Sequence, residues 1–211
     1  MYKKFKQFIY RILIPFIRIW KYLSWHYYLY THNKINLIVG AGPTKYRSWF
    51  STDIVTLDLT NEMHFKKYFS RKKISKILAE HVLEHLTDQE LYLIISNLYK
   101  YSDSGINIRI AVPDGFHKDE NYIKTVKPGG TGIGADDHKH LFNYISLSKY
   151  FEKYDFKSFP VEYWDEDQKF HSTYSNDKNG YVIRSFINDK RNSDGLPHYT
   201  SLIVDFKKTQ H

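Results

Sequence analysis

Short apolar runs alternate with longer amphipathic stretches along the middle of the chain. The apolar runs at residues 35–39, 74–79 and 107–112 are each expected to form a strand, and residues 49–59 are expected to contain another. Residues 61–73 and 84–101 have the pattern of helices, and in the second Thr87 is the expected N-cap, with Glu90 three residues later. Strands that alternate with helices favour a mostly parallel sheet in an α/β domain.

The last third of the chain is patterned differently. Residues 146–154 are predicted to form a helix, whereas 159–164 and 200–206 are strand-like without a helix between them. These two strands therefore predict an antiparallel hairpin at an edge of the sheet. A long polar insertion, residues 165–198, separates them. Residues 115–140 are rich in glycine and charge and too long for a simple connection, so they predict a functional loop.

Residues 1–31 form a distinct N-terminal segment, basic and aromatic, which we expect to be an amphipathic helix. Lys4, Arg11 and Arg18 are seven residues apart, so they fall on one side of that helix. Pro15 is expected to kink or divide it. Such a helix could lie on an anionic membrane surface or pack on the edge of the following domain, and a disordered segment is the third alternative.

Charge is concentrated in this N-terminal part. The net charge is +8, and the first 52 residues hold nine basic residues and no acid, while the remaining 22 basic residues are balanced by all 23 acidic ones. The rest of the chain, residues 32–211, is assigned to one α/β domain. Because residues 53–211, which make up most of this domain, have no basic excess, nucleic acid is not an expected partner.

Several classes of protein are excluded by what the sequence lacks. It has no cysteine, and hence no disulfide, thiolate metal site or cysteine nucleophile. Neither a Gly-x-Ser-x-Gly elbow nor a phosphate-binding Gly-x-x-x-x-Gly-Lys-Ser/Thr loop occurs, which argues against a hydrolase of that fold and against an NTPase. Lys45 stands where a dinucleotide-binding loop would have its third glycine, so a dehydrogenase is a distant alternative. No run of about 20 apolar residues is present to form a transmembrane helix.

Residues suited to ligand binding follow the predicted strands. Gly40 and Gly42 end the first strand, and Asp53 and Asp58 lie in or after the second. Glu80 and His81 end the third strand, and Asp114 follows the fourth. Ligands of open parallel sheets bind at the carboxyl ends of strands, and glycine lets the backbone approach a ligand closely. The whole set, in this order along the chain, indicates a ligand site more specifically than any one of these residues does.

These residues stand in motifs that resemble class I S-adenosylmethionine-dependent methyltransferases. The motifs are Ile-Asn-Leu-Ile-Val-Gly-Ala-Gly at 35–42, Ser-Thr-Asp-Ile at 51–54, Ala-Glu-His-Val-Leu-Glu-His-Leu at 79–86 and Arg-Ile-Ala-Val-Pro-Asp at 109–114. Further segments, at 127–132, 135–139 and 199–205, are similar to a bacterial subgroup of predicted methyltransferases linked to cell-surface polysaccharide synthesis. The resemblance implies a Rossmann-like fold and S-adenosylmethionine as cofactor.

The resemblance also implies roles for the strand-end residues. Gly40, Ala41 and Gly42 would face the methionine part of the cofactor. Asp53 would bind the ribose hydroxyls, and Asp58 with Leu59 would lie near the adenine, although the two aspartates could exchange these roles. Glu80 and His81 would line the cofactor pocket. The family's usual third glycine is absent, and only residues 43–50 separate the first two strands, so the helix between them must be very short.

Candidate catalytic residues lie in the loop 115–140. His117, Asp136, Asp137 and His138 could act as bases on an acceptor hydroxyl, because the pKa of histidine lies near neutrality. The segment 136–138 could instead hold a divalent metal ion, or its carboxylates could cap the next helix. Of these three roles for residues 136–138, namely catalysis, metal binding and capping, capping is the simplest. We assign no metal ligand.

The expected function is methyl transfer from S-adenosylmethionine to an oxygen of a glycan or cell-envelope polysaccharide precursor. A cytoplasmic location follows, with peripheral attachment to the inner face of the membrane through residues 1–31. The alternative is a non-catalytic protein with a methyltransferase-like domain that serves as a scaffold at the membrane surface.

Overall fold

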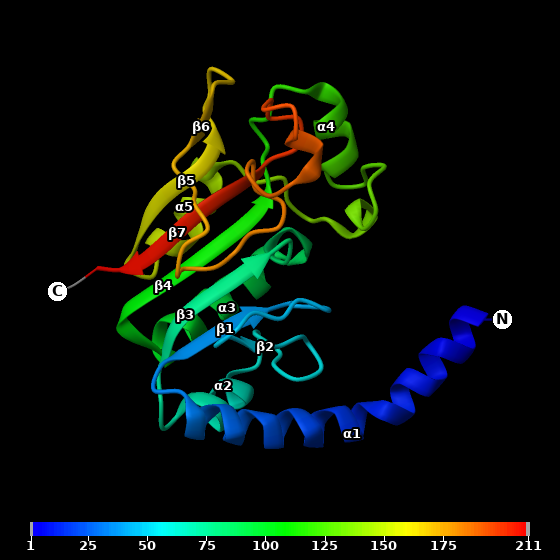
Figure 1. Cartoon of the computed structure of the whole chain (residues 1–211), viewed down its shortest axis with the longest axis vertical. Helices are drawn as coiled ribbons and strands as arrows, with labels where there is room; N and C mark the ends of the chain where they lie inside the picture. Colours follow the sequence, from blue (N-terminus) through cyan, green and yellow to red (C-terminus); the bar gives the residue numbers. More distant parts are fainter. Residues whose placement is uncertain (1, 210–211) are drawn as a thin grey trace.

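A computed structural model describes the backbone of residues 2–209 and the side chains of residues 12–209. Its centre is a seven-stranded sheet in the order β2-β1-β3-β4-β7-β5-β6 (Figure 1). β2, β1, β3 and β4 pair in parallel, and β7 is antiparallel to both β4 and β5. The predicted fold class is confirmed: a Rossmann-like, mostly parallel sheet with an antiparallel edge strand, preceded by a helix.

The strands are β1 (Ile35–Val39), β2 (Phe50–Ser51), β3 (Ile74–Glu80), β4 (Ser102–Pro113), β5 (Phe156–Trp164), β6 (Phe170–Ser172) and β7 (Ser201–Lys208). The α-helices are α1 (Tyr2–Thr31), α2 (Glu62–Phe69), α3 (Asp88–Tyr101), α4 (Glu120–Val126) and α5 (Tyr144–Glu152). Three single-turn 3₁₀ helices are η1 (Leu83–His85), η2 (Ala135–Asp137) and η3 (Lys190–Asn192).

Several elements differ from their predicted form. The second strand lies within residues 49–59, as predicted, but covers only two of them, because the chain beyond it turns at Asp53 and Asp58, which accept hydrogen bonds from the amides of residues 55, 56 and 60. β5 and β7 are antiparallel neighbours as predicted, but β7 lies inside the sheet and β6 takes the edge. The loop 115–140 contains α4 and η2, and no helix joins β1 to β2.

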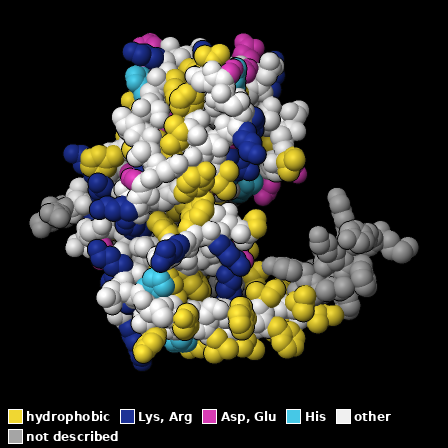
Figure 2. Space-filling model, in the orientation of Figure 1, with side chains coloured by type: hydrophobic (Ala, Val, Ile, Leu, Met, Phe, Trp, Pro, Cys, Tyr) yellow, Lys and Arg dark blue, Asp and Glu magenta, His cyan; other side chains and the backbone are white. Residues whose placement is uncertain are grey.

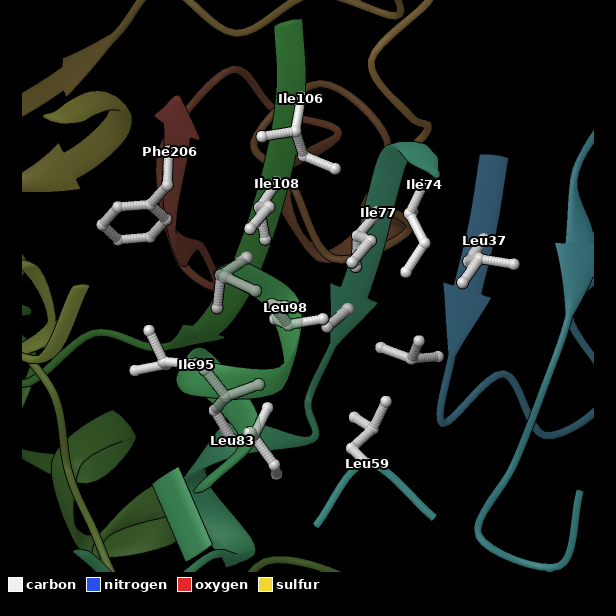
Figure 3. Packing of buried hydrophobic residues seen from close by; sticks show 14 of the residues in the cluster. Leu37, Leu59, Ile74, Ile77, Leu83, Ile95, Leu98, Ile106, Ile108 and Phe206 are labelled. Carbon is white, nitrogen blue, oxygen red and sulfur yellow. The ribbon is translucent and has the colours of Figure 1, made fainter. Parts of the chain in front are cut away.

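One face of the sheet carries the main core, under α2, α3 and α5. α3 begins with the predicted cap: the Thr87 side chain accepts from the amide of Glu90, whose carboxylate accepts from the amide of Thr87. Apolar side chains on successive strands point to the same face because the sheet is pleated. Figure 3 shows Ile77 and Ile108 directed towards Leu98 of α3. This packing fixes the positions of the strand ends.

The opposite face is covered by the insertion between β6 and β7. Tyr174 and Val182 pack there on Leu78 and Ile203. The insertion is held down by Arg109 of β4, which is buried and donates from Nη1 to the Asp177 carboxylate (2.8 Å) and to the Gly180 carbonyl (2.9 Å). An irregular segment therefore takes the place of a second helical layer.

α1 packs on the β2 edge of the sheet through its C-terminal half (Figure 1). Trp25 and Tyr28 are buried and contact Phe50, with ring centroids 5.0 and 5.5 Å away. Lys21 Nζ donates to the Ser51 carbonyl at 2.7 Å. The packing alternative for the N-terminal segment thus holds for this half of the helix.

The N-terminal half of α1 extends away from the sheet. The helix is continuous across Pro15, so the proline does not divide it, but Figure 1 shows a change of direction towards the N-terminus. The side chains of Lys4 and Arg11 lie outside the described residues, whereas Arg18 donates to the Val55 carbonyl at 3.2 Å. Among the described residues, no helix is long and apolar enough to cross a membrane.

Candidate functional site

A cleft of about 650 Å³ opens at the carboxyl ends of β1 and β3. β1 and β3 are neighbours in the sheet. The chain runs from β1 to β2 on one side and from β3 to β4 on the other, so the loops after β1 and β3 diverge. Open α/β sheets bind ligands at this topological switch point. Residues from four segments line the cleft, within 38–44, 78–85, 125–138 and 183–199, together with Pro113. Its volume suits a small-molecule ligand.

The Gly40–Gly42 turn forms one wall of the cleft. Gly40 and Gly42 have positive φ angles, 61° and 50°, and Ala41 donates to the Thr52 carbonyl at 2.9 Å. A Cβ on Gly40 would lie 2.4 Å from Cγ2 of Val82, whereas one on Gly42 would meet nothing within 4 Å. Gly40 is therefore required by backbone conformation and close packing, and the turn presents bare backbone to the cleft. The three predicted residues of this turn all line the cleft.

Glu80 and His81 form the wall after β3. The Glu80 carboxylate accepts from the amides of Ile183 (3.1 Å) and Arg184 (2.8 Å), which ties the insertion to the strand end. His81 has a φ of 54°, an uncommon conformation for a residue other than glycine. Its Nδ1 lies 3.0 Å from Glu84 Oε1 and its Nε2 lies 3.2 Å from Ser201 Oγ. Both predicted residues line the cleft.

Asp53 lies next to the glycine turn but not among the residues that line the cleft. It follows Thr52, whose carbonyl accepts from Ala41. Asp53 Oδ1 accepts from the amides of Val55 (3.0 Å) and Thr56 (3.2 Å), so one oxygen stabilises the local turn. Oδ2 takes part in no hydrogen bond with the described side chains or backbone.

Asp58 and Leu59 lie farther along the same connection, outside the cleft lining. Asp58 Oδ1 accepts from the amide (2.9 Å) and hydroxyl (2.6 Å) of Thr60. Leu59 is buried in the main core, and its carbonyl accepts from Asn97 at 3.0 Å. Asp58 and Leu59 therefore have structural roles. Of the two aspartates, Asp53 lies nearer to the glycine turn along the chain.

Of the four candidate catalytic residues, His138 alone lines the cleft among the described residues. Its Nδ1 lies 2.6 Å from the Val126 carbonyl, so the proton belongs on Nδ1 and Nε2 carries the lone pair. Asp136 and Asp137 are exposed within η2, and Asp137 pairs with Lys139 at 3.0 Å, which lowers the pKa of its carboxyl. Neither caps the next helix: Asn143 is the N-cap of α5, which corrects that expectation.

His117 is buried away from the cleft. Its ring stacks on Tyr122, with centroids 3.9 Å apart, and Nδ1 accepts from the amide of Asp119 at 3.1 Å. Burial lowers the pKa of His117 to about 4, because the charged ring would lose its water. The ring is thus neutral near pH 7 and part of an aromatic cluster. The sequence pattern could not separate it from the other histidines of the loop.

Two buried carboxyls lie behind the cleft. Asp114 accepts from the amides of Phe116 (3.0 Å) and Trp164 (2.8 Å). Glu162 accepts from the amide of Phe186 (2.8 Å) and the hydroxyl of Ser172 (3.1 Å). Burial raises the pKa of each carboxyl to about 7. Glu162 joins β5 to the insertion through Phe186, whereas Asp114 joins the end of β4 to β5 through Trp164.

Glu84 and His85 also line the cleft, although the sequence pattern placed them only at the start of the predicted helix 84–101. They belong to η1, one turn before α3. The Glu84 carbonyl accepts from the amides of Lys139 (2.7 Å) and His140 (3.1 Å), so η1 is joined to the segment that carries His138. The repeated Glu-His at 80–81 and 84–85 was the available signal.

Comparisons with known proteins give structural likeness alone. No family model and no curated protein sequence matches this chain. A SAM-dependent methyltransferase from Archaeoglobus fulgidus is similar in structure, with a TM-score of 0.49, 18% identity, and coverage of 90% of this chain and 93% of that one.

Two further structures are similar at a lower level. A SAM-dependent methyltransferase from Anabaena variabilis has a TM-score of 0.44 and 9% identity over 82% of this chain and 75% of that one. LepI in complex with SAM has a TM-score of 0.44 and 10% identity over 83% of this chain but only 43% of that one. All these scores lie below 0.5, so the fold assignment stands on the strand order and any function on the residues of the cleft.

Proposed function

We propose that this chain is an S-adenosylmethionine-dependent methyltransferase. The observation that carries the proposal is the cleft at the switch point, with the Gly40–Gly42 turn on one side and Glu80 and His81 on the other. Bare backbone in the left-handed conformation can approach the methionine part of the cofactor, as the resemblance implies for this turn. Bound there, S-adenosylmethionine would supply an electrophilic methyl group.

The ribose of the cofactor is assigned to Asp53. Asp53 directly follows Thr52, which is hydrogen-bonded to the glycine turn, and it keeps one carboxylate oxygen outside the described hydrogen bonds. A carboxylate can accept hydrogen bonds from both hydroxyls of a ribose. Asp58 and Leu59, farther along this connection, are assigned to the adenine side.

His138 is proposed to act on the acceptor. With its proton on Nδ1, Nε2 can accept a proton from an acceptor hydroxyl in the cleft. The acceptor oxygen then forms its bond to the methyl carbon as the carbon–sulfur bond breaks, and S-adenosylhomocysteine is released. Holding the two reactants in line supplies much of the rate. Asp136, Asp137 and His117 have no such position, since they do not line the cleft.

The proposed acceptor is a glycan or a cell-envelope polysaccharide precursor. The resemblance of residues 127–132, 135–139 and 199–205 to a bacterial subgroup supports this choice. Arg184 and Tyr199 line the cleft, and their polar groups are able to bind sugar hydroxyls.

Residues 1–31 are proposed to hold the domain 32–211 on the inner face of an anionic membrane. Apolar side chains of α1 are exposed on the side away from the sheet, and Figure 2 shows them gathered along this helix. They include Phe16 (66% exposed), Trp20 (71%) and Tyr27 (71%). Since no acid occurs in the first 52 residues, anionic lipid headgroups complement this surface.

Calorimetric titration of the full chain with S-adenosylmethionine and with S-adenosylhomocysteine tests the proposed activity. One-to-one binding in the micromolar range is expected. Absence of binding by a chain that melts cooperatively would reject the enzyme and favour the alternative, a non-catalytic scaffold with a methyltransferase-like domain.

A further inference from the structure

Three side chains of the cleft wall form a cluster with the composition of a metal site. One donor atom each of Glu84, His85 and His138 lies within 4.8 Å of the other two. Metal–ligand bonds of about 2.0–2.2 Å separate the donor atoms around one ion by roughly 3–4 Å, so small side-chain rotations would bring the three together. We propose that Glu84, His85 and His138 bind one divalent transition-metal ion.

The environment of Glu84 is a second observation, separate from the clustering, that favours a bound cation. Its side chain is fully buried yet lines the cleft, and neither carboxylate oxygen accepts a well-formed hydrogen bond from the described residues. Its nearest polar neighbour is Nδ1 of His81, 3.0 Å from Oε1. A buried carboxylate oxygen that accepts no hydrogen bond is costly, and a cation on Oε2 would remove that cost.

The two histidines are oriented as metal ligands commonly are. Nδ1 of His138 is occupied by the Val126 carbonyl at 2.6 Å, which leaves Nε2 as its donor atom. Nδ1 of His85 lies 3.5 Å from Oδ2 of Asp137. A carbonyl or carboxylate on the second ring nitrogen fixes the tautomer and orientation of a ligating imidazole. Asp137 therefore has a supporting place beside the site.

The backbone holds the two halves of the cluster together. Glu84 and His85 come from η1, and His138 comes from the segment after η2. The amides of Lys139 and His140 donate to the Glu84 carbonyl, so the two segments meet at the cluster. The rings of His85 and His138 contact each other edge to face, with centroids 4.7 Å apart. The site is thus built before an ion arrives.

Ligand chemistry selects the kind of ion. Two imidazoles and one carboxylate favour ions such as Zn²⁺, Mn²⁺ or Co²⁺ over Mg²⁺ and Ca²⁺, which prefer oxygen ligands. Three protein ligands leave positions open for an acceptor oxygen. This role rests on the proposed function, whereas metal binding does not. With the ion present, Nε2 of His138 would bind the ion in place of acting as the base, and the ion would lower the pKa of the acceptor hydroxyl so that its proton passes to water.

The test is metal titration of the untagged full chain, stripped with chelator, in the absence of cofactor and acceptor. Zn²⁺ and Mg²⁺ are followed by calorimetry and Co²⁺ by its visible absorption. We expect one Zn²⁺ or Co²⁺ per chain and weaker binding of Mg²⁺. His138→Ala and Glu84→Gln should each weaken binding at least about 100-fold, since even residues that only support ligands contribute 10–100-fold.

His198→Ala is the matched control, because His198 is an exposed histidine paired with Asp194 outside the cleft. It should bind the ion as the unmodified chain does. The proposal is overturned if the unmodified chain binds no ion at one-to-one stoichiometry, or if His138→Ala and Glu84→Gln, shown to be folded by a cooperative melt, bind unchanged. S-adenosylmethionine binding, measured separately without metal, reports on the proposed function alone.

Discussion

Arg109 and Asp205 form a two-pronged ion pair across β4 and β7, with Nε 2.7 Å from Oδ1 and Nη2 2.8 Å from Oδ2. The guanidinium reaches Asp177 with its remaining nitrogen, so one buried side chain joins two strands and the insertion. Arg109→Ala would leave the Asp205 carboxylate buried without its partner. We expect a loss of about 3–5 kcal/mol in the free energy of unfolding, measured with urea.

The exposed Arg71 offers the control for this change. Arg71→Ala should alter the free energy of unfolding by less than about 0.5 kcal/mol. Equal effects of the two substitutions would contradict the role given to Arg109.

Stability should depend on pH through Glu162. Its pKa is about 7 in the folded chain, because of burial, and near 4.3 in an unfolded one. Between these values the unfolded chain releases a proton that the folded chain keeps, so stability is lost as pH rises from about 4.5 to 7. Glu162→Gln should flatten this part of the profile, since a Gln can accept from the Phe186 amide and donate to Ser172.

The measurement is urea unfolding at a series of pH values. Asp114, whose pKa is also about 7, remains in the variant, so the slope should shrink and not vanish. Glu120→Gln, at an exposed site, should reproduce the original slope. An unchanged slope in Glu162→Gln would show that Glu162 ionises at its ordinary pKa.

The two glycines of the cleft turn should differ in their tolerance of a methyl group. Gly40→Ala adds a Cβ 2.4 Å from Val82 Cγ2 and strains a positive φ, whereas Gly42→Ala adds strain alone. Left-handed strain costs about 1–2 kcal/mol and overpacking a further 1–3 kcal/mol. Urea unfolding should therefore rank Gly40→Ala below Gly42→Ala in stability. The reverse order would mean that the turn has another conformation.

Asp53 and Asp58 can be distinguished by conservative amide substitutions. Asp53→Asn keeps an oxygen for the Val55 and Thr56 amides but removes the carboxylate proposed to bind the ribose. Hydrogen bonds to a charged group contribute about 1.5–3 kcal/mol, so S-adenosylmethionine should bind roughly 10–100-fold more weakly in calorimetry. Asp58→Asn should have a smaller effect. If the larger loss falls on Asp58→Asn, the ribose belongs to that residue.

Membrane attachment is best tested by substitution on the exposed side of α1. Deletion of residues 1–30 is unsuitable, because it removes the buried Trp25 and Tyr28. Phe16→Ser with Trp20→Ser should weaken sedimentation with phosphatidylglycerol vesicles by more than about 10-fold, since each large apolar side chain contributes about 1.5–3 kcal/mol when buried.

Leu196→Ser, an exposed apolar position outside α1, should leave vesicle binding unchanged. Pure phosphatidylcholine vesicles should bind the unmodified chain less well, because they lack the anionic headgroups. Equal binding of the double variant and the unmodified chain would exclude α1 as the membrane contact.

Local signals were sufficient for much of the fold and for part of the site. β1 spans the predicted residues 35–39, and the cap of α3 at Thr87 was predicted from the four residues 87–90. The glycine turn and Glu80–His81 lie in one cleft because parallel strands end at the same edge of the sheet, and the alternation of strands and helices predicted a parallel sheet.

Long-range contacts account for what the sequence did not reveal. The irregular insertion is held on its sheet face in part by Arg109, which binds Asp177 of the insertion, 68 residues away, as well as Asp205 of β7, 96 residues away. Likewise, Glu84 faces His138 through a backbone contact between two loops. The second strand is short because side-chain turns at Asp53 and Asp58 outweigh the β propensity of the residues around them.

α1 also protects the chain against aggregation through the β2 edge of its sheet. Lys21, Tyr28 and Arg18 donate to the carbonyls of Ser51, Ser48 and Val55, which face outwards along the β2 side. Unpaired strand edges recruit other strands and lead to aggregation. By occupying these acceptors and packing Trp25 on the half-buried Phe50, the helix covers the edge on which a neighbouring chain would otherwise extend the sheet.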